Sequence, residues 1–225
     1  MTATSDALPI SMDRAEVPHD LMEAPPVIHL IEDDPSVRHT ASDLFETAGW
    51  EVREYLSAEE FLSGQRPAGD ACLVFDMMLP GMSGLDLLKR LNAKGWQTPA
   101  VVLSCPCDAS SAVAALKAGA ADFLEKPANE DMLFASVTDA IENYREARER
   151  AEARHRAQAR FARLTKREND VLMQILDGKP NKIIAAELNI NIRTVENHRA
   201  SVMAKTGATS LPALVKLFLA SAGSD

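Results

Sequence analysis

The chain has 225 residues, of which 46% are apolar and 25% charged, with a formal net charge of −9 at pH 7. This apolar fraction is typical of a folded protein and excludes a wholly disordered chain. No stretch reaches the ~20 apolar residues that a membrane-spanning helix needs, and the N-terminus lacks a secretory signal. Three cysteines without metal-finger spacing favour a reducing cytoplasm, and no membrane partner is expected.

The negative charge is confined to one part of the chain. Residues 1–141 hold 9 basic and 23 acidic side chains, a net charge of −14, whereas residues 142–163 carry +3 and residues 164–225 carry +2. Such an asymmetry indicates two domains with different partners. The average charge of the chain argues against binding to nucleic acid, but the charge of its last part does not.

The first 26 residues contain four prolines and five acidic residues, so we expect residues 1–26 to form a disordered acidic tail. After this tail, short apolar runs alternate with amphipathic stretches that carry helix signals such as the capping box Ser57-Ala-Glu-Glu60. The runs lie at 27–31, 71–75 and 99–103, with weaker ones near Val52 and Phe123. This alternation predicts an α/β doubly wound domain with a parallel sheet over residues 27–141.

Charged and hydroxyl side chains cluster where the predicted strands end. In chain order they are Glu32, Asp33, Asp76, Ser104 and Lys126. Sites in such sheets form at the carboxyl ends of the strands, so these five groups should converge. Crowded carboxylates repel one another without a cation, and oxygen ligands without His or Cys favour a hard ion such as Mg²⁺.

These residues and their neighbours resemble the receiver domain of two-component response regulators. The separations from Asp33 to Asp76 (43 residues), Asp76 to Ser104 (28) and Ser104 to Lys126 (22) fit that family. Two further stretches resemble it, Asp76-Met-Met-Leu-Pro-Gly-Met-Ser-Gly84 and Ala118-Gly-Ala-Ala-Asp-Phe-Leu-Glu-Lys-Pro127. The resemblance implies a flavodoxin-like five-stranded sheet with the strand order 2-1-3-4-5.

The resemblance also implies a role for each acidic residue. Asp76 would be the phosphoacceptor that takes a phosphoryl group from a sensor histidine kinase. Asp33, Asp76 and the backbone carbonyl of Met78 would ligate Mg²⁺, and Glu32 would hold a metal-bound water.

The remaining site residues would contact or follow the phosphoryl group. Lys126, together with Mg²⁺, would neutralise charge on the transferring oxygens. Ser104 would bind the phosphoryl group and move inward, and Phe123 would change rotamer as it does so. Lys126-Pro127 is a candidate cis peptide. The receiver would catalyse its own phosphorylation, and we expect no separate enzyme activity.

Ser104 is followed by Cys105-Pro-Cys107, where the family usually has a small residue directly after the hydroxyl. Two thiols beside a switch residue are a candidate redox or metal-binding pair. No neighbouring Lys, Arg or helix start is evident to stabilise a thiolate, and cysteine commonly behaves as a small apolar residue. A structural role for Cys105 and Cys107 is therefore the favoured interpretation.

Residues 130–163 contain no Pro or Gly and are rich in Ala, Arg and Glu, which favours one long helix. A heptad step connects Val137, Ile141, Tyr144, Arg148, Ala151, His155, Gln158 and Ala162. This seam is apolar only at its start. Residues 142–163 are therefore predicted to be a helical linker, either a weak coiled coil or a single solvated helix.

Residues 164–225 carry the signals of a small all-α domain. The capping box Thr165-Lys-Arg-Glu168 opens a helix that ends near Gly178, a short helix follows over 182–188, and Asn191 caps a helix over 192–205. Two helices joined by a three-residue turn form a helix-turn-helix, whose second helix enters the major groove of DNA.

Three stretches here resemble the LuxR-type DNA-binding domain: Leu164-Thr-Lys-Arg-Glu-Asn-Asp-Val-Leu172, Asn181-Lys-Ile-Ile-Ala185 and Thr194-Val-Glu-Asn-His198. With the receiver in front, residues 27–220 resemble the NarL/FixJ family of two-component response regulators. The stretches Arg193-Thr-Val-Glu-Asn-His-Arg-Ala-Ser-Val-Met-Ala-Lys205 and Ser210-Leu-Pro212 carry a narrower likeness to its FixJ branch.

The predicted DNA contacts follow from the face that the second helix turns outward. Val195 and Val202 share the inner face, because they lie seven residues apart. The predicted base readers on the outer face are Arg193, Glu196, Asn197 and Ala200. The other predicted DNA contacts are Lys182, Thr194, His198, Arg199 and Lys205, with the three basic residues on phosphates.

Together these features predict a phosphorylation-controlled transcription factor. Phosphorylation of Asp76 would favour a homodimer that places two helix-turn-helix domains on double-stranded promoter DNA, with RNA polymerase as a further candidate partner. A domain with a charge of only +2 is a weak anchor, so two copies should be needed for firm binding. The alternatives are a DNA-binding protein switched by Cys105 and Cys107, and a phosphorelay intermediate that passes the group to a histidine protein.

Overall fold

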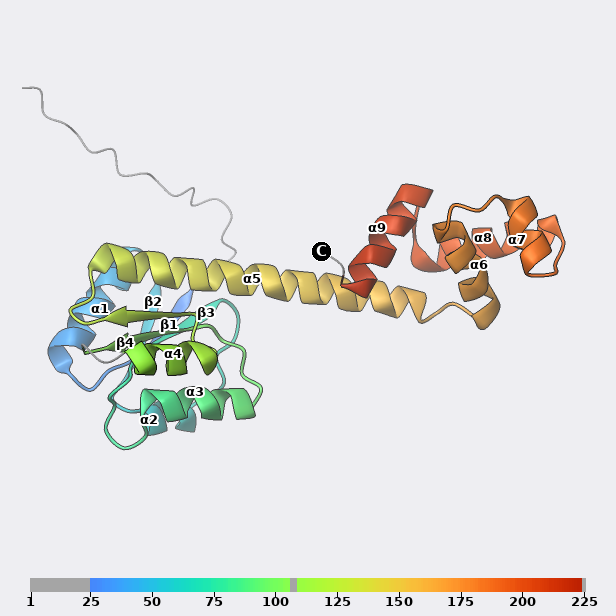
Figure 1. Cartoon of the computed structure of the whole chain (residues 1–225). Helices are drawn as coiled ribbons and strands as arrows, with labels where there is room; N and C mark the ends of the chain where they lie inside the picture. Colours follow the sequence, from blue (N-terminus) through green and yellow to red (C-terminus); the bar gives the residue numbers. More distant parts are fainter. Residues whose placement is uncertain (1–24, 106–108, 224–225) are drawn as a thin grey trace, which may run out of the picture. The chain divides into compact units, whose positions relative to one another are not determined.

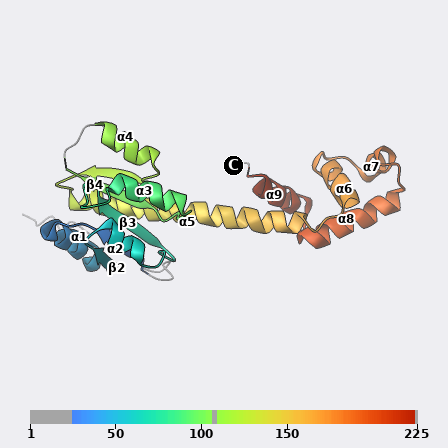
Figure 2. The ribbon, with the colours of Figure 1, turned by 90° about the horizontal axis from the view of Figure 1, so that it is seen from below.

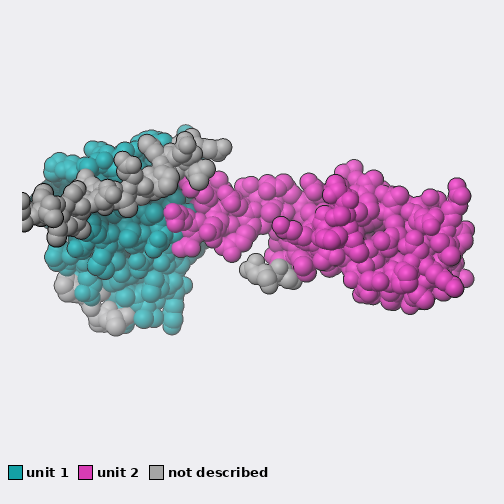
Figure 3. Space-filling view, turned by 90° about the horizontal axis from the view of Figure 1, so that it is seen from above, with its two compact units in different colours: residues 1–141 teal, residues 142–225 magenta. Residues whose placement is uncertain are grey.

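The computed structural model describes residues 25–105 and 109–223. The chain forms two compact units, residues 1–141 and 142–225, which Figure 3 colours separately. Most of the predicted tail over 1–26 lies outside the described residues, and so does Cys107 of the candidate thiol pair. Each unit has an apolar core of its own.

The first unit is built on a five-stranded parallel sheet with the order β2-β1-β3-β4-β5, which confirms the predicted fold. Strands and helices alternate along the chain, and β3 at the centre of the sheet is buried throughout. The elements are β1 (Val27–Ile31), α1 (Pro35–Thr47), β2 (Glu51–Tyr55), α2 (Ala58–Ser63), β3 (Ala71–Asp76), α3 (Gly84–Ala93), β4 (Ala100–Ser104), α4 (Ala109–Lys117) and β5 (Asp122–Glu125), followed by α5 (Glu130–Phe161), which begins in this unit and continues past its last residue, Ile141.

Helices cover both faces of this sheet, as the alternation of strands and helices predicts (Figure 1). Successive strand residues point to opposite faces, so Ile28 and Leu30 of β1 pack with α1 and α5, whereas Ile31 packs with α2, α3 and α4. Figure 2 shows α3 and α4 from below, on the side of the sheet away from α5. With both faces covered, the edge at the carboxyl ends of the strands is left for function.

The helix α2 begins at the predicted capping box, with one difference. Ser57 Oγ accepts the N–H of Glu60 at 3.2 Å, as expected. The Glu60 carboxylate accepts the N–H of Leu56 at 2.7 Å instead of the N–H of Ser57. The carboxylate therefore ties the helix start to the end of β2 rather than closing on its own N-cap.

The predicted long helix is present as α5, which is continuous over Glu130–Phe161. Val137 and Ile141, the first two positions of the predicted heptad seam, are buried in the core beside β1 and β3. These apolar residues therefore pack within the first unit. The coiled-coil interpretation loses its two strongest positions, because a helix that covers a sheet has nearly the same apolar spacing.

The second unit contains the predicted helix-turn-helix. Its helices are α6 (Lys166–Leu176), α7 (Asn181–Glu187), α8 (Ile192–Thr206) and α9 (Leu211–Ala222). The ends of α7 and α8 differ by one residue from the predicted ranges 182–188 and 192–205. Val195 and Val202 are fully buried, which confirms that they form the inner face of α8.

The sequence reasoning missed α9, although Ser210 caps it and Pro212 stands in its first turn. The end of α5 packs on this helix: the Phe161 and Phe218 rings meet edge to face with centroids 5.8 Å apart, and Gln158 Nε2 donates to the carbonyl of Ser221 at 3.0 Å. Among the described residues, no single helix is long and apolar enough to cross a membrane; α8 and α9 pass that test only as a pair bent by 58°.

One buried polar side chain in the first unit is His29 on β1. Its Nδ1 is hydrogen-bonded to the Tyr55 hydroxyl at 3.0 Å, and its ring stacks on Tyr55 and meets the edge of Phe61. Burial, with the nearby charge of Arg53 adding to it, lowers the pKa of His29 from 6.5 to about 4, although Glu51 opposes the shift. The imidazole is therefore neutral in the native state at neutral pH.

This shift predicts that the first unit loses stability in mild acid. Between the unfolded pKa of 6.5 and the native pKa of about 4, the unfolded chain binds a proton that the native chain excludes. The free energy of unfolding should therefore fall by about 2 kcal/mol more in the wild type than in His29→Gln between pH 7 and pH 5. Both tryptophans, Trp50 and Trp96, lie in this unit, so urea unfolding followed by tryptophan fluorescence measures it.

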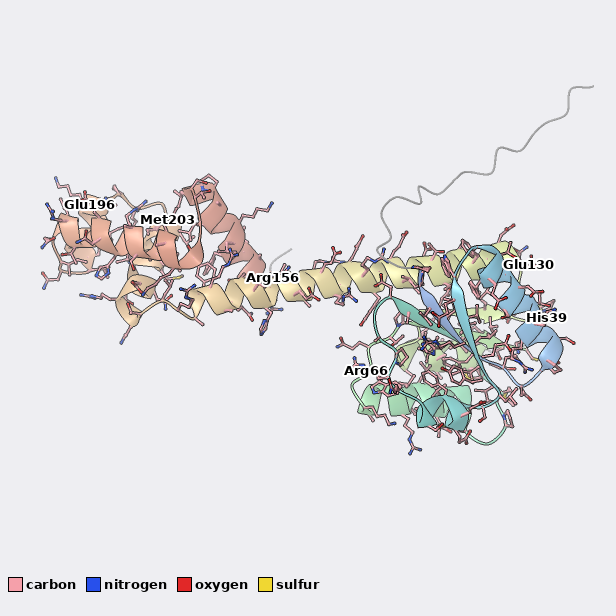
Figure 4. The ribbon with its side chains drawn as sticks, turned by 180° about the vertical axis from the view of Figure 1, so that it is seen from behind. His39, Arg66, Glu130, Arg156, Glu196 and Met203 are labelled. Atoms are coloured by element: carbon pink, nitrogen blue, oxygen red, sulfur yellow. The ribbon has the colours of Figure 1, made fainter. Side chains whose placement is uncertain are left out.

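The matched control is His39→Gln, because the His39 side chain on α1 is exposed (Figure 4). That variant should keep the pH dependence of the wild type. Equal pH dependence in the wild type and in His29→Gln would contradict the buried, neutral state of His29.

Candidate functional site

The carboxyl edge of the parallel sheet gathers the five predicted site residues of the first unit. Asp76 is the last residue of β3 and Ser104 the last residue of β4, two strands that pair directly. Glu32 and Asp33 follow β1, and Lys126 follows β5. Ligand oxygens of Glu32, Asp33 and Asp76 all lie within 4.8 Å of one another. The predicted convergence of the acidic residues is therefore confirmed.

Lys126 links two of these carboxylates. Its Nζ lies 2.6 Å from Glu32 Oε2 and 2.6 Å from Asp76 Oδ2, and its side chain is only 13% exposed. The Lys126 N–H donates to the Ser104 carbonyl at 2.7 Å, which holds the end of β5 against β4. The peptide bond between Lys126 and Pro127 is cis, as the sequence predicted. One ammonium group thus stands among three carboxylates.

The site shifts the pKa values of two of its members. Burial raises the pKa of Glu32, and the hydrogen bond and charge of Lys126 oppose this shift. Burial by itself lowers the pKa of Lys126, but the hydrogen bonds and charges of Asp76 and Glu32 outweigh it and raise the pKa above its ordinary value. Lys126 is therefore held as an ammonium ion.

Asp76 is held from two sides. Its Oδ1 accepts the N–H of Met78 at 2.9 Å, its Oδ2 accepts Lys126, and the residue is 6% exposed. The backbone behind it is tightly packed, because a Cβ at Gly84 would lie 2.6 Å from the Asp76 carbonyl oxygen. Glycine at position 84 lets α3 begin directly against the end of β3. The orientation of the Asp76 carboxylate is thus fixed by its neighbours.

Asp34, the acidic residue that directly follows Glu32 and Asp33, has a different task. Asp34 is the N-cap of α1, and its Oδ1 accepts the N–H groups of Ser36 at 2.8 Å and Val37 at 3.3 Å. Such a cap stabilises the helix start. Asp34 therefore anchors α1, while the exposed Asp33 carboxylate stays available at the edge of the sheet.

Arg38 is a functional residue that sequence reasoning missed. From α1 its Nη1 donates to the carbonyls of Glu32 at 2.8 Å and Asp33 at 3.3 Å, and its Nε pairs with Glu54 on β2 at 3.2 Å. Arg38 therefore holds the backbone from which two of the site acids project. Its position one turn into the helix that follows the acids was the available signal, since that placement turns a side chain back toward the N-terminus.

Glu59 on α2 was also missed. Its Oε1 accepts the N–H of Met82 at 2.9 Å, in the loop that follows Asp76. A Cβ at Gly81, where φ is +78°, would lie 2.8 Å from the same oxygen, so glycine there permits the contact. Nothing local in the sequence connects positions 59 and 82, and only the fold brings them together.

The cluster fits a hard divalent cation. It offers carboxylate oxygens from Glu32, Asp33 and Asp76 and no nitrogen or sulfur ligand, which is the donor set that Mg²⁺ prefers. Three carboxylates with one ammonium leave an excess of negative charge that a cation would offset. The Met78 carbonyl stays a predicted ligand, because only its N–H is placed relative to the cluster.

The predicted switch residues occupy different environments. Ser104 is buried, and Phe123 on β5 is half-buried against the core beneath α2, α3 and α4. Their movement on phosphorylation stays a prediction. Cys105 is exposed and free, whereas burial raises the pKa of Cys72 on β3 to about 12. No observation on Cys105 favours the thiol-switch alternative.

The second unit presents the predicted base readers on the outside of α8. The exposed positions are Arg193, Glu196, Asn197 and Ala200. Glu196 lies about two turns before Met203, near the start of the helix (Figure 4). Thr194 has a structural task, because its N–H and hydroxyl both donate to Asn191 Oδ1, at 2.7 and 2.9 Å. His198 is half-buried, as expected for a packing or phosphate residue.

Ion pairs divide the basic residues around the helix-turn-helix into two groups. Arg167 pairs with Asp170, Lys179 with Glu187 and Asp177, and Lys205 with Glu168. Within the part of the chain that the structure describes, no acidic side chain pairs with Lys182, Arg193 or Arg199. These three cations of the motif remain available for contacts with DNA.

Comparison with protein families supports both assignments. The family described as the response regulator receiver domain matches residues 28–138. The family described as bacterial regulatory proteins of the luxR family matches residues 162–218. A DNA-binding domain of this kind argues against the alternative of a phosphorelay intermediate that does not bind DNA.

Known proteins show the same arrangement of domains. The chain is 42% identical to the transcriptional regulatory protein FixJ of Azorhizobium caulinodans, over 85% of this chain and 91% of FixJ. It is 36% identical to the response regulator protein TmoT of Ectopseudomonas mendocina, over 85% of this chain and 87% of TmoT.

Solved structures agree with these relatives. The response regulator StyR matches with a TM-score of 0.75 and 38% identity, over 87% of this chain and 98% of StyR. Full-length FixJ from B. japonicum matches with a TM-score of 0.57 and 36% identity, over 88% of this chain and 98% of FixJ. The chain therefore belongs to the FixJ-like family of two-component response regulators, transcriptional regulators that join a receiver domain to a LuxR-type DNA-binding domain.

Proposed function

We propose that Asp76 accepts a phosphoryl group from a phosphohistidine of a sensor histidine kinase, and that this modification controls binding of the second unit to promoter DNA. The setting of the Asp76 carboxylate carries this proposal. It lies at the open edge of the sheet between the Lys126 ammonium and the Met78 N–H, beside Glu32 and Asp33. A carboxylate held in this way can act as a nucleophile toward a phosphoryl group.

The transfer exchanges one bond to phosphorus for another. An oxygen of Asp76 attacks the phosphorus, a P–O bond forms as the P–N bond breaks, and the imidazole leaves with the electron pair and takes up a proton. Lys126 supplies a fixed positive charge next to the developing phosphoryl oxygens, which lowers the barrier. The receiver thus promotes its own phosphorylation, and we propose no separate enzyme activity.

Mg²⁺ is the cofactor that we propose for this site. Bound at Asp33 and Asp76, with Glu32 holding a metal-bound water, it would offset the charge on the phosphoryl oxygens. Arg38 would contribute by holding the carbonyls of Glu32 and Asp33, so that the acids keep their spacing before the ion arrives.

Phosphorylation would act on DNA binding by favouring a homodimer. One helix-turn-helix offers Lys182 and Arg199 as predicted phosphate contacts without an ion pair to the described residues, beside Arg193 as a base reader, and two phosphate contacts are few. Two copies double that number and also require two half-sites, so dimerisation raises both affinity and specificity. RNA polymerase is a further proposed partner, and the cytoplasm, where chromosomal DNA lies in bacteria, is the proposed compartment.

The phosphorylation site can be tested by substitution. Asp76→Asn should abolish the acyl phosphate that forms when the full chain is incubated with acetyl phosphate and Mg²⁺, because the amide cannot attack phosphorus. Intact-protein mass spectrometry detects the added group. Asp86→Asn, at an exposed carboxylate on α3, is the matched control and should leave labelling intact. Labelling that persists in Asp76→Asn would show that another residue is the phosphoacceptor.

The role of Arg38 in cation binding can be measured by calorimetric titration of Mg²⁺ into the unphosphorylated chain. Arg38→Ala should weaken Mg²⁺ binding about fivefold. The substitution removes hydrogen bonds that contribute roughly 1 kcal/mol net to the order of the backbone at Glu32 and Asp33. Glu54→Ala removes only the exposed ion pair of Arg38 and keeps both carbonyl contacts, so it should change the affinity little. Equal effects of the two substitutions would contradict the proposed role of the carbonyl contacts.

The base readers can be separated from phosphate contacts by selecting duplexes from a random library with the full phosphorylated chain. Arg193→Ala or Asn197→Ala should alter the selected bases at one or two positions, with a loss of discrimination of about 1–3 kcal/mol each. Lys182→Ala should weaken binding to every duplex equally, because a phosphate contact carries no sequence information. An equal loss on all sequences for Asn197→Ala would assign that residue to the phosphate contacts.

A further inference from the structure

The most deeply embedded charge of the second unit belongs to Glu168 in the first turn of α6. Its side chain is 7% exposed, yet three donors reach the carboxylate. Oε2 accepts Lys205 Nζ at 2.6 Å and the Thr165 N–H at 2.7 Å, and Oε1 accepts the Ser201 hydroxyl at 2.5 Å. A buried carboxylate with this many donors is fully satisfied only in one arrangement of its neighbours.

Two of the three donors come from α8, the helix that carries the predicted base readers. Ser201 and Lys205 lie four residues apart, one turn along the same side of α8. Val195 and Val202 pack into the core, and Arg193 and Asn197 project outward, so Glu168 binds α8 along a flank between these two faces. Contacts along the flank oppose rotation of a helix about its own axis. Apolar packing on the inner face resists such rotation only weakly.

We propose that Glu168 is a positioning residue for DNA recognition: it sets the rotation and the axial position of α8, and Lys205 serves this purpose rather than binding a DNA phosphate. The inference rests on the proposed function of α8 as the reading helix. It changes the role predicted for Lys205, whose side chain is 30% exposed and whose ammonium is already bonded to a carboxylate. A cation neutralised in this way adds little to the attraction of the phosphate backbone.

The ionisation of Glu168 agrees with this role. The hydrogen bond from Lys205, followed by those from Ser201 and the Thr165 N–H, lowers its pKa from 4.5 to about 2. The carboxylate is therefore charged at neutral pH, where it can pair with the Lys205 ammonium.

The sequence showed only half of this arrangement. Thr165 and Glu168 form the complete capping box that the sequence predicted. A capping box accounts only for the Thr165 N–H on Oε2. The other two donors, Ser201 on Oε1 and Lys205 on Oε2, lie 33 and 37 residues further along the chain and depend on how α8 crosses α6.

The test compares the salt dependence of binding with its specificity. Fluorescence anisotropy of the full phosphorylated chain is measured over a range of NaCl concentrations on two duplexes: one selected from a random library by the wild type, and a scrambled duplex of equal length. The variants are Lys205→Met and Ser201→Ala, with Lys182→Met as the matched loss of a lysine without an ion pair. Circular dichroism confirms that each variant keeps its helices.

If Glu168 positions α8, Lys205→Met and Ser201→Ala lower the ratio of selected to scrambled affinity about tenfold and leave the salt slope on the scrambled duplex unchanged. Lys182→Met lowers the salt slope by about 1 on both duplexes, as a phosphate contact should. The double variant Glu168→Gln with Lys205→Met shows nearly the same ratio of affinities as Lys205→Met alone, since both substitutions act through one contact.

Two other outcomes overturn the inference, and they are distinguishable. A salt slope reduced by about 1 in Lys205→Met, with an unchanged ratio, returns Lys205 to the phosphate contacts. A wild type that enriches no duplex from the library overturns the proposed function of α8 itself, and the positioning role with it.

Discussion

The contact of one ammonium with two carboxylates is the interaction on which the first unit depends. A parallel sheet brings the ends of its strands to one edge, so Glu32, Asp33 and Asp76 are forced together by the topology and not by attraction. Lys126 makes that crowding tolerable because it bonds to two of the three. The three carboxylates still outnumber the one ammonium, and the remaining negative charge favours a metal ion, while Lys126 supplies a fixed cation that suits a phosphoryl group.

The sequence predicted most of this site because the site is simple in sequence terms. Each group ends or follows a short apolar run. Parallel topology makes the ends of such runs neighbours, so five positions that are far apart in the sequence lie at one edge of the sheet. Arg38 and Glu59 escaped prediction because both act through backbone groups of other segments. A backbone group has no signature of its own in the sequence. The placement of Arg38 one turn into α1 was the one local signal, and the contact of Glu59 with the Met82 N–H could be recognised only after the fold was known.

Two helix signals share one physical limit, since neither a periodic apolar pattern nor a capping pattern reveals which other groups it contacts. Val137 and Ile141 fit a seam between two chains as well as they fit the face of a helix on a sheet, and the sheet is their true partner. Glu60 and Glu168 both lie three residues after an N-cap, but the first reaches back to Leu56 and the second reaches across to α8. Local rules predicted both helix starts correctly and left open which groups outside the helix start each carboxylate binds.

The end of α5 has a consequence for where the DNA-binding domain starts as a folding unit. A boundary placed at residues 163 and 164, where composition changes, separates Phe161 from Phe218 and Gln158 from Ser221. Ala157 is buried as well, so the last turn and a half of α5, about five residues, belongs to the core that it borders. A fragment intended to fold alone should therefore begin upstream of Ala157, because a chain cut at the compositional boundary would expose one side of α9 that the intact protein keeps covered.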